Sequence, residues 1–355
     1  MGPDDGVRCM LMRGGTSKGA YFLAEDLPGD PAERDDLLLR IMGSPDARQI
    51  DGIGGAHPLT SKVAVISSSA RADADVDYLF LQVGVDQATV SGRQNCGNLL
   101  AGVGPFSVER GLADGPPVRI HMVNSGSVAT ATFPARDGVV QYAGEAAIAG
   151  VPGTAAPIVL DFAGTEGSAT GALLPTGHVA EVLDGIRVTC VDNGMPVVVV
   201  AASDLGRSGH ETVADLEADR DLGARVQSLR LAAGQLMGLG DVSATSVPKI
   251  TLVAAPAAGG TICTRTFIPV RVHDSIGVLG AVSVATALLL PGAAGADLAA
   301  LAPAQTRFDI EHPAGHLQVE VEVDTAGMPP RVIRSGVVRT ARRLFDGTVF
   351  PRRFT

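Results

Sequence analysis

The chain alternates between short runs of apolar, often β-branched residues and polar stretches rich in glycine, proline and aspartate. Runs of this length and composition predict strands. The predicted strands cover residues 7–12, 20–23, 63–66, 78–83, 118–123, 128–133, 197–202, 250–255, 267–272 and 317–323. Strands therefore dominate, and the pattern predicts an α+β protein.

Four segments instead carry apolar residues at helical spacing. The first begins at Asp30, because aspartate caps a helix and the proline that follows fits the first turn. The second covers residues 213–238 as one helix. The third covers residues 97–110. The fourth, residues 279–290, is apolar on every side, and such a helix has to be buried.

The order of these elements repeats once along the chain. Each half contains a turn, an apolar strand, a lysine before a β-branched strand, a small-residue apolar helix and a further strand. Lys62 in the first half corresponds to Lys249 in the second, whereas Cys96 corresponds to Leu279. Self-similarity at such a long period indicates a duplicated domain.

The repeat predicts two pseudo-symmetric domains, residues 1–183 and residues 184–355, each a strand-rich roll around one central helix. The boundary is expected near residues 180–186, just before the second copy begins. Because only one copy carries the cysteine, we expect the active site in the cleft between the domains.

Composition narrows the classes of function. Hydrophobic residues make up 46% and charged residues 19%, as in a packed globular protein. The net charge of −10 argues against nucleic acid or an anionic membrane as a partner. The cysteines show neither a disulfide framework nor metal-site spacing, and no N-terminal signal segment is present, so we expect a cytoplasmic protein. The uncharged stretch 276–296 predicts a buried helix rather than a membrane span.

Cys96 is the first candidate for chemistry. It directly precedes the helix predicted at 97–110, where unpaired backbone N–H groups and the helix dipole favour a thiolate or a bound carboxylate. Gly97 would let a ligand approach the backbone, and Asn95 and Asn98 supply polar groups beside it. The alternative is a small buried cysteine with a packing role only.

Lys62 is the second candidate. It begins an apolar strand within a stretch from residue 53 to residue 70 in which His57 is the other ionisable residue. Partial desolvation lowers the pKa of a lysine and makes it a usable base. The alternative is a lysine that extends from a strand end into solvent. Lys249 is its counterpart and a candidate carboxylate contact.

The turn at residues 13–19 contains glycines and hydroxyls and predicts a carboxylate-binding loop that uses Thr16 and Ser17. Its Gly-x-Ser-x-Gly pattern does not indicate a hydrolase nucleophile elbow, because a strand follows where that motif needs a helix. The loop 51–55 lacks a dinucleotide fingerprint and is expected to line the site near Lys62. His273 and Ser275 are the candidates from the segment before the second central helix. The histidines lack metal-ligand spacing, so neither a metal nor another cofactor is expected.

Several further segments have a distinctive sequence. They are MRGGTSKGAYF (12–22), IDGIGGAHPLTSKVAVI (50–66), VDYLF (76–80), NCGN (95–98), VPGTAAP (151–157), MGLGDVS (237–243), IEHPAG (310–315) and VVRTARRLFDGTVFP (337–351). Through these segments the chain resembles the PrpF family of allylic isomerases, which share the diaminopimelate-epimerase-like fold. The resemblance extends from about residue 7 to residue 351 and is closest to the 4-oxalomesaconate tautomerases of that family.

The resemblance implies roles for particular residues. Lys62 and Cys96 fall on the family's catalytic lysine and cysteine, and Thr16 and Ser17 fall on its substrate-binding turn. Epimerases of this fold place a second cysteine near Leu279, so two-thiol racemisation is not expected here. Asp274 and Leu279 depart from the family pattern, which leaves the identity of the substrate open.

The expected activity is cofactor-independent proton movement across an allylic tricarboxylate, with keto–enol tautomerisation of 4-oxalomesaconate favoured. Lys62 would remove the proton, Cys96 would relay one or position the substrate, and backbone N–H groups at residues 97–98 would stabilise the dienolate. Thr16, Ser17 and Lys249 would hold carboxylates. Alternatives are isomerisation of 2-methylaconitate, aconitate or 3-methylitaconate, an amino-acid epimerase, and a non-catalytic carboxylate-binding protein. The expected partner is the small substrate, with a homodimer left open.

Overall fold

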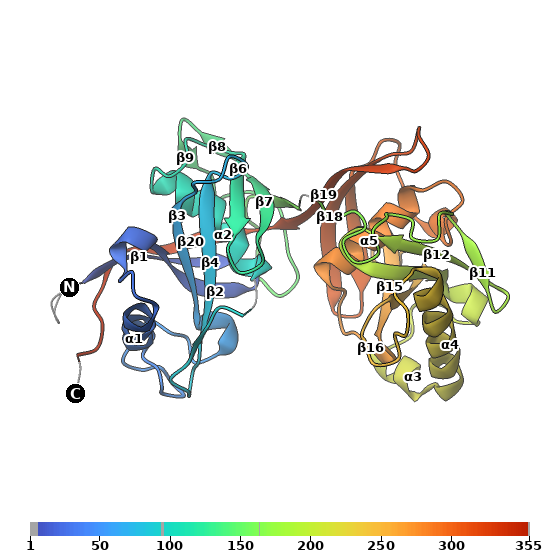
Figure 1. The fold of residues 1–355 in the computed structure, drawn as a ribbon, viewed down its shortest axis with the longest axis horizontal. Helices are drawn as coiled ribbons and strands as arrows, with labels where there is room; N and C mark the ends of the chain where they lie inside the picture. The colour runs from blue at the N-terminus through green and yellow to red at the C-terminus, as the bar shows by residue number, and fades with distance from the viewer. Residues whose placement is uncertain (1–5, 94–95, 163, 354–355) are drawn as a thin grey trace. The chain divides into compact units, whose positions relative to one another are not determined.

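The computed structural model describes residues 6–93, 96–162 and 164–353. The chain forms two compact units (Figure 1). The first unit comprises Met1–Asp161 and Arg339–Thr355, and the second comprises Phe162–Val338. The chain therefore passes from one unit to the other twice.

In its described residues the first unit is built from strands, two α-helices and two short 3₁₀ helices at Ala24–Asp26 and Pro58–Thr60. Its elements are β1 (Val7–Gly14), β2 (Ser17–Leu23), α1 (Pro31–Met42), β3 (Lys62–Ser68), β4 (Val76–Val83), β5 (Val90–Ser91), α2 (Gly97–Glu109), β6 (Val118–Met122), β7 (Ser127–Thr132), β8 (Ala135–Arg136), β9 (Val139–Val140), β10 (Ile158–Phe162) and β20 (Ala341–Val349).

The strands of the first unit follow the order β20-β1-β2-β3-β4-β6-β7. The pairs β2–β3 and β4–β6 are parallel, and the others are antiparallel. Helices cover both faces of the sheet. Phe22 packs in one core with Leu38 and Ile41 of α1, whereas the neighbouring Tyr21 donates a 2.5 Å hydrogen bond to the Leu99 carbonyl of α2. This alternation follows from the period of two along a strand.

The second unit has the same kinds of element, with 3₁₀ helices at Ala202–Leu205 and Ala296–Leu298. Its elements are β11 (Glu181–Leu183), β12 (Ile186–Asp192), β13 (Pro196–Ala201), α3 (Val213–Ala218), α4 (Arg220–Leu236), β14 (Lys249–Ala254), β15 (Ile262–Ile268), β16 (Arg271–Val272), α5 (Val278–Leu289), β17 (Arg307–His312), β18 (Gly315–Asp324) and β19 (Arg331–Arg339).

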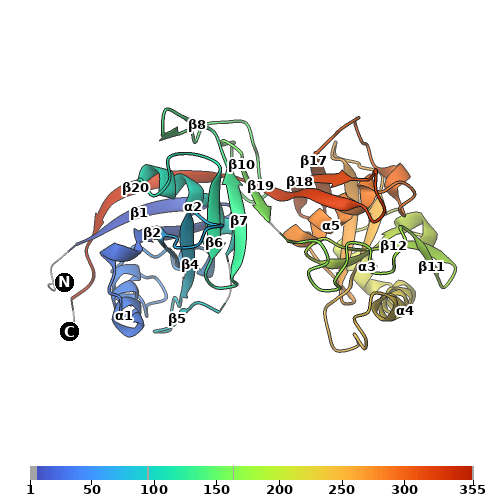
Figure 2. The same ribbon diagram turned by 45° about the horizontal axis from the view of Figure 1, so that its top comes forward.

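The second unit repeats the topology of the first. Its strand order is β11-β12-β13-β14-β15-β17-β18-β19, and the pairs β13–β14 and β15–β17 are parallel, as β2–β3 and β4–β6 are. Each unit is a sheet that curls around one helix, α2 in the first and α5 in the second (Figure 2). The predicted fold class, two pseudo-symmetric α+β domains with these two central helices, is confirmed.

Both central helices are buried, as the hydrophobic pattern predicts. In α5 every residue from Gly280 to Leu288 is buried, because its side chains are apolar or small on all sides. Among the described residues no helix is both long and apolar enough to cross a membrane. Pro105 lies inside α2 without ending it, since the helix continues to Glu109.

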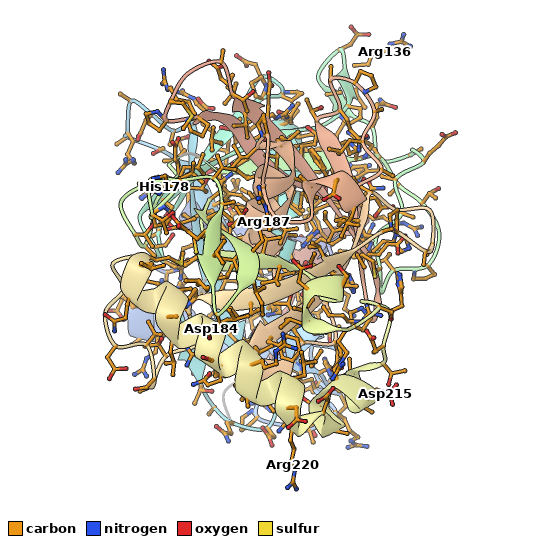
Figure 3. The ribbon with its side chains drawn as sticks, turned by 90° about the vertical axis from the view of Figure 1, so that its right-hand side faces the viewer. Arg136, His178, Asp184, Arg187, Asp215 and Arg220 are labelled. Carbon is orange, nitrogen blue, oxygen red and sulfur yellow. The ribbon has the colours of Figure 1, made fainter. Side chains whose placement is uncertain are left out.

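The helix predicted as one segment at 213–238 is two helices, and that prediction is wrong. Asp219 ends α3 with extended backbone angles and at the same time caps α4, because its side chain accepts a hydrogen bond from the Leu222 amide. An aspartate inside a helical pattern competes for backbone N–H groups in this way. Figure 3 shows α4 lying across the second unit, with Arg220 projecting from its N-terminal end.

The unit boundaries also differ from the predicted halves, 1–183 and 184–355. Residues 162–183 group with the second unit, and residues 339–355 group with the first. The physical reason for the second difference is β20, which pairs antiparallel with β1 from Val7↔Val349 to Gly14↔Ala341. A pairing of this length outweighs proximity along the sequence.

Candidate active site

The predicted carboxylate-binding turn is the tight connection between β1 and β2. Gly14 pairs with Ser17 across it, and Gly15 adopts a left-handed conformation with φ of 50°. The Gly15 amide donates to the Thr340 carbonyl at 2.9 Å, and the Arg13 guanidinium donates to the Gly15 carbonyl at 2.9 Å. The turn is therefore anchored on both sides.

This turn packs against the first residues of α2. Asn98 Nδ2 donates to Thr16 Oγ1 at 3.0 Å and reaches Ser17 Oγ at 3.5 Å. A Cβ on Gly14 would lie 2.4 Å from the Asn98 carbonyl oxygen, and one on Gly15 would lie 2.2 Å from Asn98 Oδ1. Both positions therefore need glycine, and the structure brings Thr16, Ser17 and Asn98 together as predicted.

Cys96 is the N-cap residue of α2, with extended backbone angles. Within the described ranges, no side chain caps this helix, and no atom lies within 4 Å of where a Cβ on Gly97 would stand. The N–H groups at the start of a helix point along its axis and carry its positive end. The start of α2 lies beside the Thr16 hydroxyl, and its role in binding an anion stays a prediction. Asn95, also predicted to bind substrate, lies outside the described residues.

Lys62 begins β3 and lies opposite Gly19 of the parallel strand β2. Its side chain is 7% exposed. Nζ donates to Gln82 Oε1 at 2.7 Å and stands 5.0 Å from the centre of the Phe80 ring. A Cβ on Gly19 would come within 2.7 Å of the Lys62 carbonyl and 2.8 Å of a Leu99 methyl group. The lysine is therefore buried against the side of the sheet that α2 covers, and does not extend into solvent.

The second unit places Lys249 in the corresponding position. Lys249 begins β14 opposite Val197 of the parallel strand β13, and its Nζ lies 3.6 Å from where a Cβ on Gly277 would be. Gly277 is the N-cap of α5. Burial lowers the pKa of Lys249 below its ordinary value, because an ammonium loses hydration there.

The two helix starts correct the residue equivalence expected from sequence. The N-caps pair Cys96 with Gly277, not with Leu279. Leu279 corresponds to Asn98 instead, because its methyl group stands 3.0 Å from where a Cβ on Gly194 would be, in the turn before β13. Sequence alone does not fix this equivalence, because the first residue of a helix is decided by its backbone angles. Neither Gly277 nor Leu279 supplies a second thiol.

His273 and Ser275 lie on the loop before α5 and bond to each other, since the Ser275 amide donates to His273 Nδ1 at 2.8 Å. Ser275 Oγ is also 3.3 Å from His312 Nε2. Sequence reasoning missed His312, although it lies in the IEHPAG motif, and it missed Gln82. Within the described part of the chain no cluster of three or more histidine, cysteine or acidic residues could hold a metal ion.

Known proteins show which family has this architecture. Residues 6–352 match the family model described as PrpF protein. The chain belongs to the PrpF family. The (4E)-oxalomesaconate Delta-isomerase of Novosphingobium sp. (strain KA1) is 56% identical to it over 98% of each chain. The 4-oxalomesaconate tautomerase of Pseudomonas putida (strain KT2440) is also 56% identical, over 97% of this chain and 95% of its own.

A solved structure has a similar fold. The crystal structure of methylitaconate-delta-isomerase matches this one with a TM-score of 0.85 and 35% identity, over 98% of this chain and 96% of that one. These relatives are isomerases, and the present PrpF protein is an isomerase as well.

Proposed function

We propose that this protein moves a proton across the allylic system of a tricarboxylate without a cofactor, with 4-oxalomesaconate as the substrate. The observation that carries the proposal is the 56% identity, over nearly the whole chain, to two relatives named for oxalomesaconate. Isomerases named for methylitaconate and methylaconitate are 36% and 35% identical. The same chemistry on a different unsaturated acid is therefore the alternative.

In the proposed reaction Lys62 removes a proton from the carbon next to the conjugated system. Its neutral amine accepts the proton, and the electron pair of the broken C–H bond spreads into a dienolate. A buried lysine without a carboxylate partner suits this step, because a carboxylate would hold it protonated. In the described residues no ion pair involves Lys62, and its hydrogen-bond partner is the neutral Gln82 amide.

The negative charge of the dienolate would rest at the start of α2, on the N–H groups of Gly97 and Asn98. Preorganised donors at a helix start stabilise a developing oxyanion without rearrangement. Cys96, at the N-cap, would return a proton to the enolate oxygen or to the far carbon, or would position the substrate for this step. A proton then passes from the Lys62 ammonium to the Cys96 thiolate, directly or through solvent, and restores both groups for the next turnover. The net reaction moves one proton and one electron pair within the substrate, so no oxidant or reductant is needed.

The carboxylates of the substrate are assigned to the residues that the sequence predicts as carboxylate contacts. Thr16 and Ser17 would donate hydroxyl hydrogen bonds, and Asn98 holds both hydroxyls in place. Lys249 would pair with another carboxylate. Burial lowers the pKa of Lys249, and the negative charge of the bound carboxylate would raise it again and keep the amine protonated. His273 and Ser275 remain predicted substrate contacts.

Proton NMR in deuterated water tests the proposal. The enzyme is incubated separately with 4-oxalomesaconate, 3-methylitaconate and 2-methylaconitate, and exchange at each carbon is followed. We expect 4-oxalomesaconate to exchange fastest, at the carbon next to its unsaturated system. Fast exchange of methylitaconate or methylaconitate with none of oxalomesaconate would transfer the assignment to that acid. Cytoplasmic residence and a homodimer stay proposals, and light scattering after gel filtration would test the second.

A further inference from the structure

Gln82 holds the amine of Lys62 from the neighbouring strand. The two residues lie directly opposite each other in the β3–β4 pair, and Lys62 Nζ donates to Gln82 Oε1 at 2.7 Å. The other end of the amide is fixed as well, because Nε2 donates to the carbonyls of Ser61 at 2.8 Å and Pro58 at 3.1 Å. An amide nitrogen can only donate, so these two carbonyls direct the Gln82 oxygen towards Lys62.

Two tyrosines on the elements around this pair carry no negative charge. Burial raises the pKa of Tyr21 on β2 and of Tyr78 on β4 well above the ordinary value, so both hydroxyls stay neutral. Both bond to the start of α2, where Cys96 stands. His57, in the loop before β3, is exposed and accepts a hydrogen bond from a neighbouring amide.

Charged side chains on the same elements have other neighbours than the Lys62 amine. Lys18 of β2 extends towards the 51–55 loop, where its Nζ is 3.3 Å from the place of a Cβ on Gly55. Asp77 lies at the end of β4 opposite to Gln82, where it accepts a 2.7 Å hydrogen bond from the Ser69 hydroxyl. Glu109 lies at the last turn of α2. The neutral amide of Gln82 is therefore the group that bears directly on the Lys62 amine.

We propose that Gln82 is the positioning residue of Lys62, a neutral acceptor that orients the amine without stabilising the ammonium as a carboxylate would. The proposal rests on the proposed role of Lys62 as the base. A carboxylate at this position would stabilise the ammonium form of Lys62. An apolar side chain would leave the amine without its hydrogen-bond acceptor, and that acceptor favours the charged form. A carboxylate and an apolar side chain at this one residue should therefore change the pH dependence of the reaction in opposite directions.

The test is the pH profile of kcat/KM for Gln82→Glu and Gln82→Met. The rate of the wild type is expected to fall at low pH, because a protonated Lys62 cannot accept the substrate proton. In Gln82→Glu this acid limb should move to higher pH by about one to three units, the effect of a contacting opposite charge. In Gln82→Met it should move to lower pH, and kcat at the plateau should fall about tenfold while KM changes little.

Two controls separate the outcomes. Gln87→Glu adds the same charge to an exposed side chain five residues away and should leave the limb at its wild-type pH. Thermal melting checks folding, and Gln82→Met decides the question if the buried carboxylate of Gln82→Glu unfolds the 58–61 turn. A Gln82→Met limb at the wild-type pH would overturn the proposal, even with a lower rate. Undiminished proton exchange by Lys62→Met would instead overturn the proposed role of Lys62 as the base, on which this proposal rests, and would leave the proposed substrate untouched.

Discussion

Replacing Lys62 with methionine tests the chemistry most directly. Methionine has nearly the same length and can rest its thioether on the Phe80 ring, which lies 5.0 Å from Nζ. The change removes the proton acceptor and leaves a side chain of similar length in the space beside α2. Loss of one positioned base should slow proton exchange by about two to four orders of magnitude.

The expected cost in stability of Lys62→Met is small by comparison. The variant leaves Gln82 Oε1 without its 2.7 Å donor, and an unsatisfied buried acceptor costs about 1–3 kcal/mol. Burial of the methionine side chain offsets part of this, since position 62 is 7% exposed. A domain of this size loses about 2–4 °C of melting temperature per kcal/mol. The variant should therefore fold and melt a few degrees below the wild type.

The assay is exchange of substrate protons in deuterated water, followed by NMR at equal concentrations of folded enzyme. Lys18→Met is the matched control, because Lys18 lies on β2 close to Lys62 but extends towards Gly55. The control should exchange at a rate of the wild-type order. Exchange by Lys62→Met within a few-fold of the wild type would refute the reasoning, and Lys62 would then only bind a carboxylate.

Three further predictions use other parts of the site. A thiol reagent at pH 8 should label Cys96 before the other three cysteines, because burial raises the pKa of Cys9 and of Cys190 to about 12. Peptide mass spectrometry measures the labelling of each cysteine, and slow labelling of all four at one rate would contradict this. Lys249→Met should raise KM about tenfold or more with little change in kcat, since a lost charged hydrogen bond costs about 1.5–3 kcal/mol. Steady-state kinetics measure both constants, and a fall in kcat at constant KM would count against carboxylate binding. Gly15→Ala should lower the melting temperature and raise KM, because the left-handed backbone at this position costs about 1–2 kcal/mol for an L-residue; an unchanged KM would separate the turn from substrate binding.

Local patterns were sufficient for the central helices and the strands that flank them. Residues 97–110 and 279–290 were predicted as helices and are α2 and α5 within one or two residues. Apolar side chains on all sides of the second segment allow no exposed position, so its place inside a roll follows from composition alone. The lysine before a β-branched strand also marked equivalent positions in the two copies correctly, because Lys62 and Lys249 each begin a strand that pairs in parallel with the strand before it.

Local patterns failed where a distant partner decides the outcome. β20 belongs to the first unit because it pairs with β1, more than 300 residues earlier in the chain. The split between α3 and α4 depends on whether Asp219 caps a new helix or faces solvent within a longer one, and its bond to the Leu222 amide decides this. In both cases the sequence permits two local structures, and a particular strand pairing or hydrogen bond decides between them.

The candidate site shows the same division. The sequence marked Cys96 by its place before a buried helix. It marked Lys62 and the hydroxyls at residues 16–17 through residue type together with the repeat and the family resemblance. Only the tertiary structure showed Gln82, which pattern reads as an ordinary polar residue on a strand, as the hydrogen-bond partner of that lysine. A hydrogen bond across two strands depends on register and on the direction of each side chain. Both are set when the sheet closes around its helix.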